Sequence, residues 1–296
     1  MKKPPLISVV MPVYNGLSLI DEQLQALSAQ DYDGPWEVVI SDNGSTDGLQ
    51  QHIATHPLRQ AGLDLVYVDS TGVASASHAR NVGVKVARGD LLAFVDHDDR
   101  VRPDWLTMLA RAAEESDAVS GSVVTTEINS PEIVPSRRLP LPEEGWTLPS
   151  GHPSFSGCNV AVWRYVHDAI GGWDAMIHTG EDHDYAWRLQ QAGFSLRHSS
   201  EAVIDYRLRT DYRGIWRQGY SYGEGDVALR VKHRESKEFP TFLNPLLFPL
   251  TVIGFVLRSP LFPKVLTRTH TGWWVYALGY EAGRIRGSIR HRVFCF

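Results

Sequence analysis

The chain has 296 residues, 43% of them hydrophobic and 21% charged, and a formal net charge of −5. This length and composition exclude a globally disordered chain and predict one large globular domain with an appendage. Only two cysteines are present, Cys158 and Cys295, which argues against a disulfide scaffold or a cysteine-based zinc site and predicts a reducing, cytoplasmic setting.

Four short apolar runs in the N-terminal third predict β-strands. They are Ile7–Met11, Trp36–Ile40, Leu63–Val68 and Leu91–Val95. The first run is too short for a signal peptide. Helix-like segments such as Leu19–Ala29 and His78–Ala87 separate the runs, and this alternation predicts βαβ units and a mostly parallel sheet. Ligands bind at the carboxyl ends of strands in such sheets, so the polar residues after each run are candidates for function.

The loop after the second run begins with Asp42 and continues as Asn43-Gly44-Ser45-Thr46-Asp47-Gly48. Asp42 is well placed to accept a hydrogen bond from a ligand. The competing interpretation is a turn followed by the cap of a helix over Leu49–Ala54, which explains most of the loop but not Asp42. Further along, Arg80 would pair either with a phosphate or with an acid at the surface.

The fourth run ends in an acidic cluster, Asp96-His97-Asp98-Asp99. Like charges at this spacing repel one another, so the cluster needs a compensating partner, and an oxygen-bound divalent metal ion is the usual one. Asp96 and Asp98 would point to the same side of an extended segment, which favours them as ligands. The alternative is a solvated loop in which Asp99 or Asp104 caps the next helix.

Further elements are expected beyond this cluster. They are a helix over Trp105–Glu115, a strand over Ala118–Thr125, a long proline-rich surface loop over Ile128–Pro153 and a strand over Phe155–Val162. A second acidic cluster, Glu181-Asp182-His183-Asp184, leads into an amphipathic helix that closes at Gly193. The helix dipole favours acids in a first turn, and this is the competing explanation for Glu181 and Asp184.

The C-terminal region is basic, with 15 Lys and Arg against 6 Asp and Glu over residues 207–296. Residues 239–257 carry no charge, but three prolines within them argue against a single membrane-spanning helix. Because aromatic residues and arginines follow, we expect residues 239–292 to form a helix or hairpin on a membrane surface. The alternatives are packing against the rest of the chain and a contact in an oligomer. The region has no recognised nucleic-acid-binding motif.

Six motifs, in order, resemble those of the family 2 glycosyltransferases with the GT-A fold. They are Pro12-Val13-Tyr14-Asn15, Ser41-Asp42-Asn43-Gly44-Ser45-Thr46-Asp47, Ala79-Arg80-Asn81, Phe94-Val95-Asp96-His97-Asp98-Asp99, Ser156-Gly157-Cys158-Asn159 and Gly180-Glu181-Asp182. The match runs roughly from Ile7 to Arg209. It implies an α/β GT-A fold, a Rossmann-like, mostly parallel twisted sheet flanked by helices, here with a C-terminal helical, membrane-associating extension.

The resemblance implies that the protein transfers a sugar from a nucleotide-diphosphate sugar to an acceptor hydroxyl, with inversion at the anomeric carbon and a UDP-sugar as the favoured donor. The departing diphosphate builds up negative charge, which Mn²⁺ or Mg²⁺ held by carboxylates neutralises. A further carboxylate takes the proton of the acceptor.

The resemblance also implies roles for individual residues. The nucleotide would be bound by Pro12, Val13, Tyr14, Asn15, Asp42, Arg80, Asn81 and Asp96. The metal ion would be held by Asp98, with Asp96 and Asp99 as further candidates. Asp182 would be the general base, with Glu181 and Asp184 in reserve. The sugar or acceptor pocket would include Gly157, Asn159 and Trp173.

One feature of the family is not matched. Many members carry a histidine on the strand after the helix of the general base, as a metal ligand or phosphate contact. Here that strand carries Asp205, and His198 lies earlier, so Asp205 or His198 is the candidate for completing the metal shell. His97 and His183 lie inside the acidic clusters, at positions that vary in the family, and are weaker candidates.

These inferences predict a GT-A catalytic domain over residues 1–209 and a basic, apolar helical extension over residues 210–296. The nucleotide-sugar half would reach about residue 100, and the acceptor half would cover residues 101–209. The expected enzyme is a metal-dependent hexosyltransferase of polysaccharide biosynthesis. It would be cytoplasmic, peripheral on the inner face of the cell membrane, and would act on a lipid-linked or polymeric surface glycan.

Two alternative functions stay open. One is a non-catalytic nucleotide-sugar-binding protein, against which the presence of Asp96, Asp98 and Asp182 counts. The other is a sugar nucleotidyltransferase, which would normally carry a basic, glycine-rich loop after its first strand. The loop of this chain, Pro12-Val13-Tyr14-Asn15-Gly16, has no basic residue.

Overall fold

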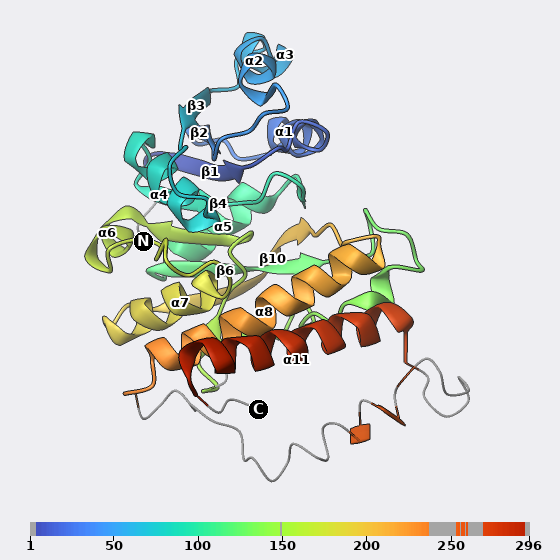
Figure 1. Ribbon diagram of the computed structural model, residues 1–296. Helices are drawn as coiled ribbons and strands as arrows, with labels where there is room; N and C mark the ends of the chain where they lie inside the picture. Colours follow the sequence, from blue (N-terminus) through green and yellow to red (C-terminus); the bar gives the residue numbers. More distant parts are fainter. Residues whose placement is uncertain are drawn as a thin grey trace. The chain divides into compact units, whose positions relative to one another are not determined.

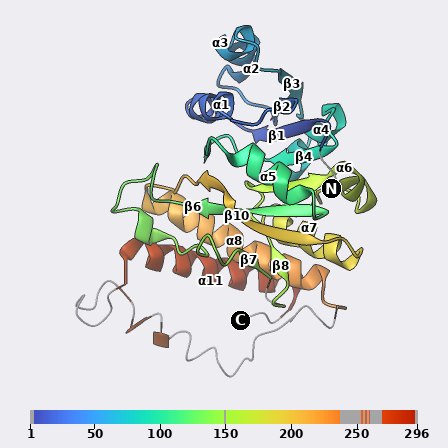
Figure 2. The ribbon, with the colours of Figure 1, turned by 180° about the vertical axis from the view of Figure 1, so that it is seen from behind.

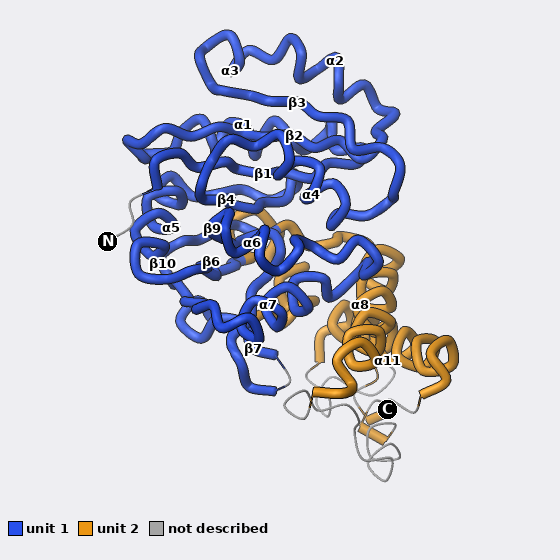
Figure 3. Tube along the Cα trace, turned by 90° about the vertical axis from the view of Figure 1, so that its left-hand side faces the viewer, with its two compact units in different colours: residues 1–124, 140–206 blue, residues 125–139, 207–296 orange. Residues whose placement is uncertain are grey.

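The computed structural model describes residues 4–148, 150–236, 253–254, 256–257, 259 and 269–293. The chain divides into two compact units (Figure 3): unit 1 comprises residues 1–124 and 140–206, and unit 2 comprises residues 125–139 and 207–296. The sequence assigns residues 125–139 to the catalytic domain, whereas the structure groups them with the C-terminal helices.

Unit 1 is built on an eight-stranded sheet in the order β3-β2-β1-β4-β9-β6-β10-β5 (Figure 1). Its strands are β1 (Ile7–Val13), β2 (Trp36–Asp42), β3 (Leu65–Asp69), β4 (Leu91–Phe94), β5 (Arg100–Val101), β6 (Ala118–Val124), β9 (Val160–Trp163) and β10 (Leu196–Asp205). The strands β3, β2, β1 and β4 are parallel, as predicted. The sheet is mixed beyond them, because β9 is antiparallel to β4 and β6, and β5 is antiparallel to β10.

Helices cover the sheet of unit 1 (Figures 1 and 2). They are α1 (Ile20–Ser28), α2 (Leu49–Ala54), α3 (Pro57–Gln60), α4 (Ala76–Val86), α5 (Trp105–Ala113), α6 (Arg164–Ala169) and α7 (Glu181–Gln191). α4 packs against β1 and β2, and α5 packs against β6, β9 and β10. Every residue of β1 is buried, as expected of a parallel strand covered on both faces.

The segment predicted as a long surface loop contains short elements. They are the 3₁₀ turn η1 (Val134–Ser136) and the strand pair β7 (Trp146–Thr147) and β8 (Pro153–Ser154). The strand predicted over Phe155–Val162 begins only at Val160. Residues before it form a turn, in which the Asn159 N–H donates to the Ser156 carbonyl at 2.9 Å.

The described residues of unit 2 include two long helices, α8 (Tyr212–Lys232) and α11 (Thr271–His291), which lie side by side (Figure 1). Their backbones approach closely at four glycines, Gly219, Gly223, Gly279 and Gly283, and most closely at Gly223 and Gly283. A Cβ atom added at Gly223 would lie 1.9 Å from the Tyr280 carbonyl oxygen, and one added at Gly283 would lie 2.0 Å from the Tyr220 carbonyl oxygen. Only glycine permits this spacing.

The predicted membrane segment lies mostly outside the described residues, which include only positions 253–254 and 256–257 of the uncharged run 239–257. In the part of the chain that the structure describes, no helix combines the length and the apolar character needed to cross a bilayer.

Candidate functional site

The first acidic cluster follows β4 at the carboxyl end of that strand. β4 ends at Phe94 and residues 97–98 form a turn, so Asp96 and Asp98 do not share one side of an extended segment, in contrast to the prediction. Gln23 of α1 fixes this loop. Its buried side-chain amide donates to the Asp96 carbonyl at 3.0 Å and accepts from the Val101 N–H at 3.0 Å.

Arg80 of α4 joins the two acidic clusters. Its side chain is 3% exposed, and it donates from Nη2 to Asp96 Oδ1 and from Nη1 to Glu181 Oε1, both at 3.0 Å. The guanidinium carbon lies 4.7 Å from the centre of the Trp173 ring, a favourable cation–π distance. Burial lowers the pKa of Arg80, but the charges of Asp96, Glu181 and Asp182 outweigh this effect and raise it. Arg80 therefore stays charged and holds the two clusters together, and its predicted contact with the nucleotide stays a prediction.

Glu181 and Asp182 open α7 and differ in environment. Burial and the charge of Asp182 raise the pKa of Glu181 to about 7, although Arg80 opposes this change. The Asp182 side chain is more exposed, at 23% against 15% for Glu181. Its Oδ2 accepts from the Gly157 N–H at 3.2 Å, and its Oδ1 accepts from the His183 N–H at 2.8 Å. Asp182 is thus held in place with an edge accessible to an acceptor.

Asp184 does not fit its predicted role as a reserve base. It is fully buried, and its Oδ2 accepts from Arg188 Nε at 2.8 Å. The other guanidinium nitrogens of Arg188 donate to the carbonyls of Ile170 and Gly172, each at 2.7 Å. Asp184 therefore fastens α7 to the preceding loop.

The side chains of Asn81, Asn159 and Trp173 make contacts that stabilise the fold around the site. The Asn81 amide donates to the Trp173 carbonyl at 2.7 Å and accepts from the Trp173 N–H at 2.9 Å. Asn159 is fully buried. It accepts from Trp105 Nε1 at 2.8 Å and donates to the carbonyls of Ser122 and Ala202, at 2.8 and 2.9 Å. Trp173 is buried beneath Arg80. The predicted nucleotide role of Asn81 and the predicted pocket roles of Asn159 and Trp173 stay predictions, and these contacts show that the three side chains also stabilise the fold.

Gly157 belongs to the site through its backbone, since its N–H holds Asp182. A Cβ atom at this position would lie 3.2 Å from Arg80 Nη2. Glycine therefore leaves room for the guanidinium group between the two acidic clusters.

The structure brings Asp96 and Asp99 together with Cys158, and one potential ligand atom from each lies within 4.8 Å of the others. Burial and the charges of Asp99 and Asp96 raise the pKa of the Cys158 thiol well above its ordinary value. The carboxylates around one buried arginine suit a hard divalent cation such as Mg²⁺ or Mn²⁺. Asp98 lies in the same loop but is not part of this group.

Neither residue predicted to complete the metal shell lies with these acids. Asp205 Oδ2 accepts from Nε and Nη2 of Arg100, at 3.0 and 2.8 Å, and Oδ1 accepts from Arg102 Nη2 at 3.3 Å. His198 Nε2 donates to the Pro142 carbonyl at 2.6 Å. Both side chains are used in packing β10 against its neighbours.

The loops after β1 and β2 are tied to each other. Asn15, with a positive φ of 50°, donates from its N–H to Ser45 Oγ and accepts from the Thr46 N–H, both at 2.8 Å. Tyr14 is exposed, whereas Pro12 and Val13 are buried in β1.

Asp42 lies at the end of β2, between these loops and β3. Its Oδ1 accepts from the Ser45 N–H and its Oδ2 accepts from the Tyr67 hydroxyl, both at 2.8 Å. Burial and this bond raise the pKa of Tyr67, which keeps the phenol a donor. Each carboxylate oxygen retains a second lone pair for a ligand.

We expect the substitution Asn159→Ala to lower the free energy of unfolding by about 3 kcal/mol, because it leaves two buried carbonyls and an indole N–H without their partner. Urea-induced unfolding measures this change. Nucleotide affinity of the folded variant should stay within about twofold of the wild-type value. A variant as stable as wild type that has lost nucleotide-sugar binding would instead place Asn159 in the sugar pocket.

Comparison with known proteins gives a consistent result. Residues 8–171 match the sequence model of a protein family that is described as glycosyl transferase family 2. The chain is 26% identical to the glycosyltransferase AglE of Haloferax volcanii, over 78% of this chain and 76% of that protein. It is also 26% identical to the pre-mycofactocin glycosyltransferase of Mycobacterium tuberculosis, over 96% of this chain but only 55% of that longer protein.

Two solved structures share the fold. The mannosyltransferase PcManGT of Pyrobaculum calidifontis, in complex with GDP-Man and Mn²⁺, has a TM-score of 0.67 and 20% identity, over 96% of this chain and 88% of that chain. S. aureus TarS 1–349, in complex with UDP-GlcNAc, has a TM-score of 0.55 and 18% identity, over 97% and 92% of the two chains.

Proposed function

The chain belongs to glycosyl transferase family 2, and from this premise we propose that its carboxylate site moves a sugar from a nucleotide-diphosphate sugar to an acceptor hydroxyl, with inversion at the anomeric carbon. The observation that carries the proposal is the Arg80 network. One buried guanidinium joins Asp96 at the end of β4 to Glu181 at the start of α7. The loop that carries the proposed donor-binding acid is thereby tied to the start of α7, where the proposed base Asp182 stands. Membership of this family argues against the alternative function of a sugar nucleotidyltransferase.

We propose a UDP-sugar as the donor. Asp42 and the exposed Tyr14 are the residues of the β1 and β2 loops that would meet the base. The solved relatives bind GDP-Man in one case and UDP-GlcNAc in another, so both bases need testing. A thermal-shift panel of UDP-, dTDP- and GDP-sugars with Mn²⁺ decides between them. The largest rise in melting temperature should come from a UDP-sugar, and a rise with GDP-sugars alone would contradict this choice.

We also propose that the reaction depends on Mn²⁺ or Mg²⁺. Asp98, Asp96 and Asp99 are the residues that would hold the cation, which, when bound, would neutralise charge on the diphosphate leaving group. Support comes from the balance of charge, since a single buried arginine faces Asp96, Glu181 and Asp182.

We assign to Asp182 the role of the general base, which takes the proton of the acceptor hydroxyl. Its carboxylate is oriented by the Gly157 N–H and is the more exposed of the two acids at the start of α7. Glu181 has a pKa raised toward neutrality and is held by Arg80. Its role is to position Arg80, and it is the alternative base if Asp182 fails the test given below.

We propose a lipid-linked or polymeric glycan as acceptor, with the protein on the inner face of the cell membrane. The support is the exposed face of α11, where Ile285 and Ile289 are 41% and 68% exposed and stand beside the exposed Arg286 and Arg290. Apolar and basic side chains alternating on one helix face suit an anionic membrane surface.

Replacing both isoleucines of α11 by serine should weaken sedimentation with vesicles that contain anionic lipid by at least about threefold, because apolar area that enters the interface is lost. The matched control is Leu141→Ser, which removes a side chain 60% exposed in unit 1. Equal losses for the two variants, or no binding by the wild-type chain, would rule out α11 as the contact.

A further inference from the structure

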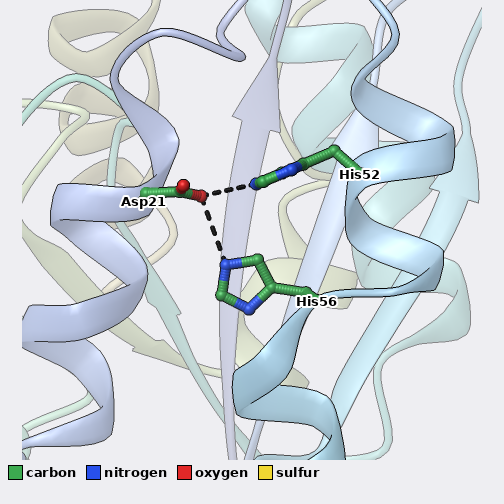
Figure 4. Close-up of side chains that lie close together, drawn as sticks. All are labelled: Asp21, His52 and His56. Atoms are coloured by element: carbon green, nitrogen blue, oxygen red, sulfur yellow. Dashed lines mark hydrogen bonds and ion pairs between the residues drawn. The ribbon is translucent and has the colours of Figure 1, made fainter.

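A second cluster of potential metal ligands lies away from the acidic clusters, on the helices that follow β1 and β2. Asp21 stands in the first turn of α1, His52 in α2, and His56 just before α3. The three side chains converge (Figure 4): Asp21 Oδ1 lies 2.6 Å from His52 Nε2 and 3.2 Å from His56 Nε2. One potential ligand atom from each of the three lies within 4.8 Å of the others.

We propose that Asp21, His52 and His56 form a binding site for a divalent transition-metal ion of the zinc type, separate from the carboxylate site. Two imidazoles and one carboxylate are ligands that Zn²⁺ accepts, at about 2.0–2.2 Å from the metal. Imidazole nitrogen also favours such an ion over Mg²⁺. Asp21 is 56% exposed and His52 is 30% exposed, so water can complete the shell, whereas His56 is 3% exposed and anchors the site in the protein.

In the metal-free protein, the hydrogen bonds of His56 place its ring proton on Nε2, the atom at which the ion would bind. His56 Nδ1 accepts from the Leu58 N–H at 3.2 Å, so the neutral ring carries its proton on Nε2 and donates it to Asp21. An ion at His56 Nε2 moves that proton to Nδ1 and breaks the bond to Leu58, which caps the four-residue helix α3. A single long hydrogen bond is a small loss compared with three metal–ligand bonds.

The proposed ion would cross-link α1, α2 and the start of α3. These elements follow the strands whose loops interlock through Asn15 and Thr46. Because the unfolded chain does not hold the three ligands together, binding should stabilise the folded protein.

Zinc binding to the full chain tests the proposal directly. Titration against a chromophoric chelator, with excess Mg²⁺ to occupy the carboxylate site, should show one more bound equivalent of Zn²⁺ in wild type than in His52→Ala or Asp21→Asn. Where a variant still binds this additional Zn²⁺ ion, its affinity should be at least about tenfold weaker, because even changes in residues that only support metal ligands lower metal affinity this much. At a hundredfold excess over the wild-type Kd, the melting temperature of wild type should rise by roughly 5–10 °C, and that of the variants should rise by no more than about half as much.

His291→Ala is the matched control, because it removes an exposed histidine of α11 outside the cluster. Its zinc stoichiometry and its shift in melting temperature should equal those of wild type. Equal zinc binding by wild type and His52→Ala would overturn the proposal, as would the absence of zinc binding by wild type, which would leave a hydrogen-bonded cluster only.

Discussion

Arg80→Met is expected to reduce sugar transfer by at least about 100-fold and to lower the free energy of unfolding by about 3–5 kcal/mol. Methionine keeps much of the length of the side chain but removes the charge that faces Asp96, Glu181 and Asp182. Breaking a buried ion pair from one side leaves uncompensated charge, which accounts for the loss of stability. The acids then separate, and a displacement of about 1 Å in a catalytic group is enough to cost 100-fold in rate.

The control for this experiment is Arg197→Met. Arg197 pairs with Glu115, and both side chains are more than half exposed, so its removal should change stability by less than about 1 kcal/mol and leave transfer intact. Urea-induced unfolding and release of nucleoside diphosphate measure the two quantities. If Arg80→Met and Arg197→Met behave alike, Arg80 does not hold the site together.

Asp182→Asn should reduce transfer by about 100- to 10,000-fold, the range contributed by a positioned general base, while donor affinity stays within about twofold of wild type. Asparagine keeps an oxygen that accepts from the Gly157 N–H, so the geometry of the α7 start is retained. Single-turnover transfer measured together with calorimetric titration of the nucleotide separates the chemical step from binding.

Glu181→Gln is the matched comparison, since it removes the neighbouring carboxylate. We expect it to weaken transfer less than Asp182→Asn does, because glutamine still accepts from Arg80 Nη1. The reverse order, with Glu181→Gln nearly inactive and Asp182→Asn active, would assign the base to Glu181, whose raised pKa suits that task.

Local patterns predicted the strands of the parallel half of the sheet and the helices between them. The alternation of apolar runs reflects burial on both faces, which depends little on distant residues. β9 was harder to predict, because its antiparallel place between β4 and β6 depends on pairing with segments far along the chain.

The candidate site shows the same division between local and distant determinants. The acids and Arg80 stand out in the sequence by type and order. The contacts among them do not, since Arg80 and Glu181 are 101 positions apart. Nothing local marks Gln23 as the residue that fixes the Asp96 loop, or Tyr67 as the donor to Asp42.

Asn81, Asn159 and Trp173 show that residues of functional motifs also stabilise the fold. Each lies in or near a motif that carries chemistry, yet its side chain makes contacts within the fold. Asn81 bonds the Trp173 backbone, Asn159 bonds the Ser122 and Ala202 carbonyls, and the Trp173 ring packs against Arg80. A motif preserves the scaffold of a site as well as its reacting groups, and only the contacts distinguish the two.

The most direct test of the central claim is the product released from a nucleotide sugar, measured with Mn²⁺ and in EDTA, for wild type and Asp98→Asn. We predict that wild type with Mn²⁺ releases nucleoside diphosphate and no pyrophosphate, and that EDTA or Asp98→Asn reduces this release by at least about 100-fold, because the leaving diphosphate loses its counter-charge. Release of nucleoside diphosphate at the same rate in EDTA and by Asp98→Asn would contradict the proposed role of the acidic cluster after β4.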